Sequence, residues 1–266
     1  PALRRDLNAR GVSPVAFTLV RSAAGLEGWG HYPAVVKPAD SAGQRGVFVA
    51  ASPEEAVAGL SRTLGFSSNG SAVVEERLDG PEVSANAFVR HGRVVACLVS
   101  DRLVLEGYPG GLPRAHVMPS QAAGAGAVAA VEDLVARLVT ILGVRQGPVY
   151  AQLKLTSRGP RVIEVSPRLD GCHLWRLAQA VAGVDLLGAT ADLLGGADPV
   201  LPAPGLMRPH TLHMVHRPPG TVLREADDAG AAAQAVARGY RYREGEVVRP
   251  VNGLMETVGW YLTVGG

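Results

Sequence analysis

Two short apolar segments in the second half of the chain carry polar side chains that suit a metal ion. AQLKL and RVIEV are separated by a Ser-Arg-Gly-Pro turn, a pattern that predicts a two-stranded hairpin. Alternation along the hairpin sends Gln152 and Glu164 toward one neighbourhood, and Ser166 and Arg168 follow. An amide oxygen, a carboxylate and a hydroxyl suit a hard cation such as Mg2+, and the arginine suits a carboxylate or phosphoryl oxygen. The alternative is a surface hairpin that carries one Glu and one Arg.

A lysine before a loop with glycines is the second candidate. Lys37 ends the apolar run AVVKP, and Gly43 and Gly46 lie in the loop that follows. An ammonium held at a strand end, next to the backbone N–H groups of a glycine loop, is a common way to hold phosphate groups. The chain has no GxxxxGK[ST] segment, so this loop is not of the Walker type. The alternative is a strand end whose lysine reaches into water.

The acidic segment EERLDGPE is the third candidate. Glu75, Glu76 and Leu78 run from a predicted strand into a turn, and Glu82 follows the turn. A strand that runs into a turn offers free backbone donors and acceptors to a flat heterocycle, and a carboxylate can bind a sugar diol. The alternative is a solvated acidic turn.

Three histidines recur at every third residue, at positions 210, 213 and 216. On a strand this spacing alternates between the two faces, so the three side chains cannot share one metal ion. We therefore interpret them as structural.

Composition limits the partners of the chain. Its 266 residues carry a net charge of +2, with no run of Lys and Arg, so we expect no nucleic-acid partner. No apolar run reaches the roughly 18 residues of a membrane span, so we expect no membrane partner. Cys97 and Cys172 form no C-x-x-C pair or disulfide framework. A reducing, cytoplasmic setting is the expectation that follows.

The elements that must position these residues alternate along the chain. We expect strands over residues 15–20, 34–38, 47–50, 71–78, 82–90, 93–101, 151–155, 161–165, 210–216 and 247–264. We expect helices over residues 2–10, 53–64, 122–142 and 174–194, a polar helix after residue 20, and an Ala-rich helix between the last two strands. Residues 102–119 are expected to be irregular because glycines and prolines gather there. The fold class is α+β, a mixed α/β chain with mainly antiparallel pairing.

The order of the three motifs resembles one family. VVKP-x3-AGQRGV, then VVEERLDGPEVS, then AQLKL-x8-EVSPR is similar to the ATP-grasp superfamily of carboxylate–amine ligases. The segment EERLDGPEVS resembles the hinge of D-alanine–D-alanine ligase, while the whole chain looks more like the biotin-carboxylase-like branch, which contains the L-amino-acid ligases. The resemblance implies two lobes of largely antiparallel sheet that hold the nucleotide between them. It divides the chain into a lead-in over residues 1–20, a small lobe over 21–92 and a large lobe over 93–266.

The resemblance also implies a role for each candidate residue at the nucleotide. Lys37 would contact the ATP phosphates as a binding and catalytic residue. The loop from Ser41 to Gly46, with Gly43, would close over these phosphates. The adenine would lie at Glu75, Glu76 and Leu78, largely against backbone groups, and the ribose hydroxyls would bind Glu82.

At the reacting groups, the resemblance places Mg2+, or Mn2+ in its stead, at Gln152, Glu164 and Ser166. Arg168 would be the catalytic residue that binds the substrate carboxylate and the acyl phosphate made from it. The implied reaction phosphorylates the carboxylate with ATP, and an amine then captures the acyl phosphate. Partners would be a small-molecule acid and amine, and a homodimer stays open.

The chain departs from the family pattern at two points. The family's metal ligands are acid, acid and Asn, whereas this chain has Gln, Glu and Ser, so its protein ligands hold Mg2+ with less charge. The family also places a phosphate-binding lysine and an α/β domain before the first helix. The resemblance therefore implies a fragment, or an N-terminal domain supplied by another chain. Two alternatives stay open: a nucleotide-binding module without ligase activity, and a biotin-carboxylase-like carboxylase.

Overall fold

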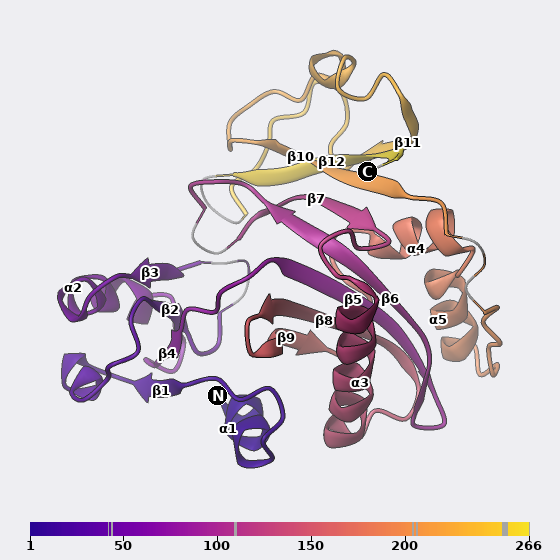
Figure 1. Ribbon diagram of the computed structural model, residues 1–266. Helices are drawn as coiled ribbons and strands as arrows, with labels where there is room; N and C mark the ends of the chain where they lie inside the picture. Colours follow the sequence, from indigo (N-terminus) through magenta and orange to yellow (C-terminus); the bar gives the residue numbers. More distant parts are fainter. Residues whose placement is uncertain are drawn as a thin grey trace. The chain divides into compact units, whose positions relative to one another are not determined.

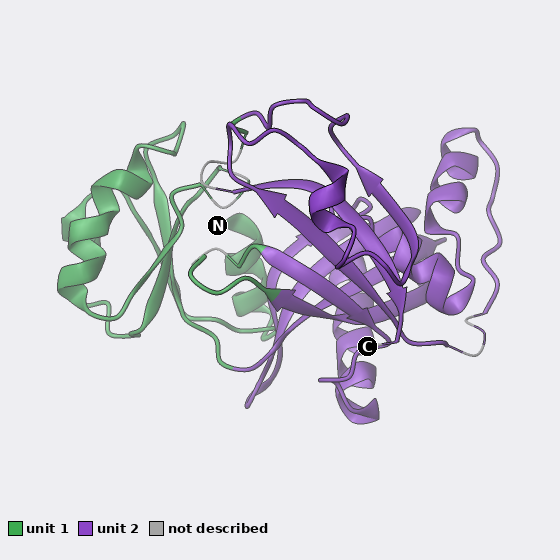
Figure 2. Ribbon diagram, turned by 90° about the horizontal axis from the view of Figure 1, so that it is seen from above, with its two compact units in different colours: residues 1–79, 104–112, 250–254 green, residues 80–103, 113–249, 255–266 purple. Residues whose placement is uncertain are grey.

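A computed structural model describes residues 1–41, 43, 45–108, 111–203, 205, 207–251 and 255–265 (Figure 1). The chain divides into two units (Figure 2). Unit 1 comprises Pro1–Asp79, Val104–Leu112 and Pro250–Leu254, and unit 2 comprises Gly80–Leu103, Pro113–Arg249 and Met255–Gly266. The lobe boundaries expected after residues 20 and 92 stay a prediction.

Unit 1 is built on a small antiparallel sheet. Its elements are α1 (Ala2–Ala9), β1 (Phe17–Val20), the 3-10 helix η1 (Ala23–Leu26), β2 (Ala34–Pro38), β3 (Phe48–Ala50), α2 (Pro53–Leu64) and β4 (Ala72–Glu76). The strand order is β1-β4-β2-β3, so β4 has a partner on each side. The polar helix expected after residue 20 is only the short η1, in a segment interrupted by Gly25, Gly28 and Gly30.

Helix α2 begins where the local sequence favours a start. The Ser52 side chain accepts a hydrogen bond from the Glu55 backbone N–H at 3.3 Å, and Pro53 occupies the first turn, where its missing N–H is not needed. Ala56 and Leu60 are buried in a core that also contains Val36 of β2. The helix expected over residues 53–64 is confirmed.

Unit 2 is built on an eight-stranded sheet. Its elements are β5 (Glu82–Arg90), β6 (Arg93–Val104), β7 (Pro113–Met118), α3 (Ala125–Leu142), β8 (Gly147–Thr156), β9 (Gly159–Ser166), α4 (Leu174–Ala182), α5 (Leu186–Leu194), β10 (His210–Arg217), the 3-10 helix η2 (Glu225–Asp228), β11 (Ala235–Tyr240) and β12 (Glu256–Val264). The strand order is β11-β12-β10-β7-β6-β5-β8-β9. The pairings whose register is described are antiparallel, as expected from the sequence.

Side-chain alternation gives this sheet two different faces. Val83, Ala85 and Ala87 of β5 point to one face and are at most 1% exposed. Helix α3, which contacts β5, β8 and β9, covers that face (Figure 1). On the other face Phe88 and Leu98 pack against α4 and α5 in one apolar cluster. The second face is apolar only where these two helices cover it, and it becomes polar further along the same strands.

Further expectations for the chain are wrong. The Ala-rich segment before residue 247 forms no α-helix: it contains η2 and the strand β11, which pairs with β12. Pairing along the sheet therefore overrides the helix propensity of alanine. The range 102–119, expected to be irregular, contains strand residues at both ends, because β6 extends to Val104 and β7 covers Pro113–Met118.

The helices of the described residues were compared with the length and apolar composition of a membrane span. In the described part of the chain, no single helix has the length and apolar composition of a membrane span. Helices α4 and α5 meet these criteria only as a pair, and they are bent by 115° at their junction.

His116 and Asn86 are polar side chains buried in unit 2. His116 on β7 is 1% exposed, and its Nδ1 lies 3.5 Å from the Ser100 hydroxyl. Burial, assisted by the charge of Arg102, lowers the pKa of His116 to about 3. The imidazole is therefore neutral in the folded protein at physiological pH. Asn86 on β5 is 4% exposed.

Gly80 tests the packing of the segment that leads into β5. Its φ is +80°, and a Cβ at this position would lie 1.9 Å from the Leu155 carbonyl oxygen. Gly92→Ala is a matched control, since Gly92 has a φ of +76° but open space around it. We expect the control to lower the free energy of unfolding by about 1–2 kcal/mol. Gly80→Ala should lower the free energy of unfolding by about 1–3 kcal/mol more than the control does, because the added Cβ clashes with backbone atoms. Equal urea midpoints for the two variants would contradict the close approach.

The burial of His116 beside Ser100 can be tested through the pH dependence of the free energy of unfolding. Between pH 6.5 and 3 the unfolded chain binds a proton that the folded chain rejects, so the free energy of unfolding should fall as the pH falls. His116 alone should contribute up to about 1.4 kcal/mol per pH unit to this slope. His116→Leu should flatten this dependence in urea titrations over the same range, while the exposed His31→Leu should keep it. A parental slope in His116→Leu would show that another group is responsible.

Candidate functional site

A row of polar side chains crosses four strands of unit 2. Ser100 of β6 lies opposite Ser84 of β5, Ser84 lies opposite Gln152 of β8, and Gln152 lies opposite Glu164 of β9. Residues directly opposite in an antiparallel pair share one face, so all four side chains lie on the face that α4 and α5 cover further along. The predicted proximity of Gln152 and Glu164 is confirmed.

A β-bulge in β9 determines which residue faces Gln152. The register shifts between Gln152 and Leu153, which leaves Ile163 as the extra residue. A regular ladder would continue from the Leu153–Val162 pair and place Ile163 opposite Gln152, with Glu164 on the α3 face. The bulge moves Glu164 to the polar face, a use of bulges that is frequent near active sites.

Ser166 and Arg168 lie beside Glu164, as the sequence predicts. The Ser166 hydroxyl donates to Glu164 Oε1 at 3.4 Å, and Arg168 Nη2 lies 3.6 Å from the same oxygen. Both charged side chains are 54% exposed, so their ion pair adds little stability. Arg168 also lies over the ring of Tyr150, at 5.9 Å from its centroid. Its guanidinium is thus held near the strand and stays accessible.

The turn after Arg168 is fixed by Asp170. Its carboxylate accepts hydrogen bonds from the backbone N–H groups of Cys172 and Leu174, the latter at 2.8 Å. These bonds connect the end of β9 to the first turn of α4. Burial raises the pKa of Asp170 to about 6, and the two backbone hydrogen bonds act against that rise.

Glu82 is the centre of a second polar group on the same face. Arg102 Nη1 donates to Glu82 Oε2 at 2.7 Å, and Gln152 Nε2 donates to the same oxygen at 3.0 Å. Lys154 Nζ lies 3.6 Å from Glu82 Oε1. Because the Gln152 amide nitrogen is committed to Glu82, its amide oxygen is the atom left to accept a donor or a cation. Arg102 was not among the residues predicted from the sequence, since only strand pairing brings it to Glu82.

The residues present fit a weakly held Mg2+. Gln152, Glu164 and Ser166 supply hard oxygen donors from two adjacent strands, but only Glu164 carries a charge. Among the described residues, no cluster of three or more His, Cys, Asp and Glu side chains could hold a metal ion. A cation at this position would therefore depend on a ligand that brings its own negative charge, such as a polyphosphate.

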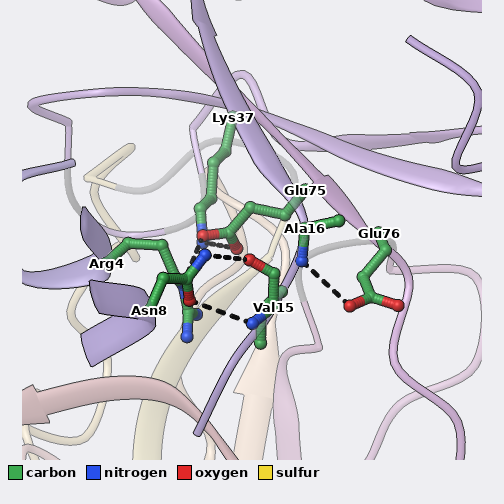
Figure 3. A network of polar contacts seen from close by, with 7 residues as sticks. All are labelled: Arg4, Asn8, Val15, Ala16, Lys37, Glu75 and Glu76. Atoms are coloured by element: carbon green, nitrogen blue, oxygen red, sulfur yellow. Dashed lines mark hydrogen bonds and ion pairs between the residues drawn. The ribbon is translucent and has the colours of Figure 1, made fainter. Parts of the chain in front are cut away.

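In unit 1, Lys37 contacts a buried carboxylate. Lys37 Nζ donates to Glu75 Oε2 at 2.6 Å, and Arg4 Nε donates to Glu75 Oε1 at 3.1 Å (Figure 3). Burial acts to raise the pKa of Glu75, but the charges of Lys37 and Arg4 outweigh it, and the net pKa is lowered. Arg4 was not foreseen because it lies 71 residues from Glu75.

The predicted adenine-binding segment leaves the sheet after Glu76. Glu75 pairs with Phe17 on one side and with Val35 on the other, so its backbone lies within the sheet. The Glu76 N–H donates to the Ala16 carbonyl at 3.0 Å, and its carboxylate accepts from the Ala16 N–H at 2.9 Å. Leu78 is half-buried and lies two residues beyond Glu76, the last residue of β4.

The predicted phosphate loop is described in part. Ser41, Gly43 and Gly46 lie within the described residues, whereas Ala42 and Gln44 lie outside them. Gly43 has a φ of +70° and Gly46 one of +72°, values that favour glycine. Just before the loop, Asp40 accepts hydrogen bonds from the Ser67 hydroxyl at 2.7 Å and from the Asn69 N–H at 3.1 Å.

The three histidines of β10 make structural contacts, in agreement with their interpretation from the sequence. His213 stacks on Tyr261 with ring centroids 4.4 Å apart, and His216 Nε2 lies 2.8 Å from the Pro113 carbonyl oxygen. His210 Nδ1 lies 2.8 Å from the Arg208 carbonyl oxygen.

Comparison with known proteins places these features in context. Carnosine synthase 1 of Mus musculus is 32% identical over 140 residues, which are 53% of this chain and 17% of the relative. The structure of L-amino acid ligase from Bacillus licheniformis matches with a TM-score of 0.76 at 22% identity, and the match covers 98% of this chain and 66% of that chain. This chain thus spans under a fifth of the carnosine synthase.

A third similar structure contains a nucleotide. It is the biotin carboxylase domain dimer of the Hydrogenobacter thermophilus 2-oxoglutarate carboxylase, in complex with MgADP, ADP and bicarbonate. The TM-score is 0.75 at 12% identity, and the match covers 99% of this chain and 61% of that chain. These likenesses show a shared fold.

The family model of the ATP-grasp domain matches residues 30–174. This range contains Lys37, the hinge segment and the polar row of β5, β8 and β9, and it is more than half of the 266 residues. The chain therefore belongs to the ATP-grasp domain family.

Proposed function

We propose that the chain is the ATP-binding part of a carboxylate–amine ligase, which forms an amide or peptide bond through an acyl phosphate and releases ADP and phosphate. The observation that carries the proposal is the pairing of Gln152 with Glu164, with Ser166 and Arg168 at the same strand end. In an ATP-grasp chain, this group combines oxygen donors for a cation with an accessible guanidinium for an acid.

Each unit contains candidate nucleotide-binding residues. In unit 1, Lys37 would bind phosphate oxygens, the loop from Ser41 to Gly46 would cover them, and the segment from Glu76 to Leu78 would bind adenine through backbone groups. In unit 2, Glu82 would bind the ribose hydroxyls. Glu82 already accepts from Arg102 and Gln152, but a carboxylate has further lone pairs for a diol.

A magnesium ion, or manganese in its place, would be held by Gln152, Glu164 and Ser166 together with the phosphates of the nucleotide. When bound, it would neutralise charge on the phosphoryl group during transfer. The MgADP in the similar biotin carboxylase domain supports magnesium as the cation that accompanies the nucleotide. Glu82 contributes by holding the Gln152 amide nitrogen, which leaves the oxygen for the cation.

Arg168 would hold the acid. Its guanidinium can bind both oxygens of a carboxylate, and this contact strengthens as negative charge grows in the transition state. Tyr150 and the Asp170 turn limit its orientation. The amine would then attack the acyl phosphate. Small-molecule acids and amines are the proposed substrates, in line with the ligases among the relatives, and a homodimer is compatible with the biotin carboxylase domain dimer.

A biotin-carboxylase-like activity is the second candidate, because that fold also matches. The carnosine synthase and L-amino acid ligase matches favour amide formation. A nucleotide-binding module without turnover is the third candidate, motivated by the single charge among the proposed metal ligands.

The metal assignment predicts opposite effects of two substitutions. Glu164→Gln removes the only charged ligand, so it should abolish the tightening of ATP binding by Mg2+ in calorimetric titrations. Ser166→Asn replaces a weak neutral ligand with an amide oxygen and should preserve or strengthen the tightening, whereas Ser157→Asn in the turn of the same hairpin should have no effect. A parental Mg2+ response of Glu164→Gln would remove the hairpin from the metal site.

Arg168 tests the ligase activity. Arg168→Lys keeps the charge but loses the planar fork, so it should lower kcat for amide formation about 10- to 100-fold and change ATP affinity by less than about twofold. Arg93→Lys, an exposed substitution at the start of β6, is the control. The assay measures phosphate release and amide product in the complete natural protein over a panel of acids and amines.

Three outcomes separate the candidates. Amide product with equal phosphate release supports the ligase. Bicarbonate-dependent phosphate release without an amine supports the carboxylase. ATP binding with no turnover across the whole panel supports the inactive module and overturns the ligase proposal.

A further inference from the structure

Glu75 is shared by two cations that come from different elements of unit 1. Arg4 is on α1, Lys37 is on β2, and Glu75 is on β4 between β1 and β2. The two cations contact different carboxylate oxygens, Arg4 at 3.1 Å and Lys37 at 2.6 Å (Figure 3). Among these three side chains, two carry a positive charge and one carries a negative charge.

The two cations differ in their access to a ligand. The Arg4 side chain is 8% exposed and that of Glu75 is 10% exposed, whereas the Lys37 side chain is 27% exposed. A buried carboxylate that loses every cation is left with a large desolvation penalty. Lys37 can therefore leave Glu75 for another anion only if Arg4 stays.

The helix that carries Arg4 is held in place by other residues. On α1, Leu7 is 1% exposed, and the Asn8 side chain donates to the Val15 carbonyl at 2.7 Å and accepts from its N–H at 3.1 Å. These contacts tie α1 to the segment that leads into β1. Arg4 thus belongs to a rigid support, while Lys37 has a flexible stem.

We propose that Arg4 is a positioning residue for nucleotide binding, which holds Glu75 so that Lys37 can exchange this carboxylate for a phosphate oxygen. The inference rests on the proposed function, in which Lys37 binds the phosphates. Without Arg4, Glu75 would have Lys37 as its remaining partner in this network and would compete strongly with the nucleotide. The net lowering of the Glu75 pKa agrees with a carboxylate that stays ionised throughout.

A purely structural role of Arg4 leads to different expectations. A loosened α1 would weaken binding of any ligand of unit 1 and would add to other losses. The counter-ion role affects only ligands with phosphates, and removal of the competing carboxylate should reverse it. Adenosine, which lacks phosphates, distinguishes the two roles.

The first experiment measures the affinities of Mg·ATP and adenosine by calorimetry. Arg4→Met should weaken ATP binding roughly tenfold, the scale of one charge-assisted contact, and leave adenosine binding unchanged. Arg5→Met, the same substitution at the next, exposed position, is the matched control and should bind both ligands like the parent. Circular dichroism checks that each variant is folded.

The second experiment tests the coupling through Glu75. In Arg4→Met/Glu75→Gln the competing charge is absent, so ATP affinity should return at least to the parental value. In a Lys37→Ala background, Arg4→Met should cause no further loss of ATP affinity. If Arg4→Met does not fold, Arg4→Lys replaces it, with a smaller loss confined to ATP.

The outcomes separate this inference from the proposed function. A parent chain that does not bind ATP overturns both. A parent that binds ATP, with Arg4→Met equal to Arg5→Met, overturns the counter-ion role alone. Equal losses for ATP and adenosine, or a double variant weaker than Arg4→Met, also overturn it in favour of a structural role.

Discussion

Strand register is the constraint on which the polar site of unit 2 depends. Side chains alternate between two faces of the sheet, and a shift of one residue moves a side chain from the polar face to the face that α3 buries. The Ser84–Gln152 pair fixes β5 against β8, and the Gln152–Glu164 pair fixes β8 against β9. A slip in either ladder would bury Gln152 or Glu164 against alanine and leucine. The apolar residues of the α3 face therefore stabilise the site indirectly, since they resist such a slip.

One face of the unit 2 sheet carries both buried apolar residues and the polar residues of the candidate site. Under α4 and α5 this face carries Phe88, Leu98 and Leu212, whose burial stabilises the fold. Further along the same strands the residues are Ser84, Gln152 and Glu82, which bind one another or a ligand. A strand that carries polar side chains of the candidate site is thus anchored by its own apolar end. Arg168 and Glu164 are exposed and weakly paired, so substitutions there should act on function more than on folding.

Local patterns in the sequence were sufficient to predict much of this arrangement. The hairpin of β8 and β9 is continuous in the chain, so the sequence was sufficient to bring Gln152 and Glu164 to one neighbourhood. The bulge at Ile163, which places the two side chains on the same face, gave no signal in the residue types. Helix α2 had a capping serine and a proline at its start. The helix predicted for the Ala-rich segment is wrong because pairing with β12, not local propensity, decides the structure of this segment. Arg4 and Arg102 were missed for the same reason: their partners are distant in the sequence, and arginines on a helix or strand usually lie in solvent.

Among the described strands, β9 also lies at the outer end of the sheet, and no further strand follows it in the order. Such an edge can recruit a strand from another molecule, and proteins counter this with bulges, prolines and charged side chains. β9 has all three, in Pro160, the bulge at Ile163 and the charges of Arg161 and Glu164. The irregularity that turns Glu164 toward Gln152 therefore also protects the chain against edge-to-edge aggregation. A substitution that regularised β9 would affect solubility as well as the proposed metal site.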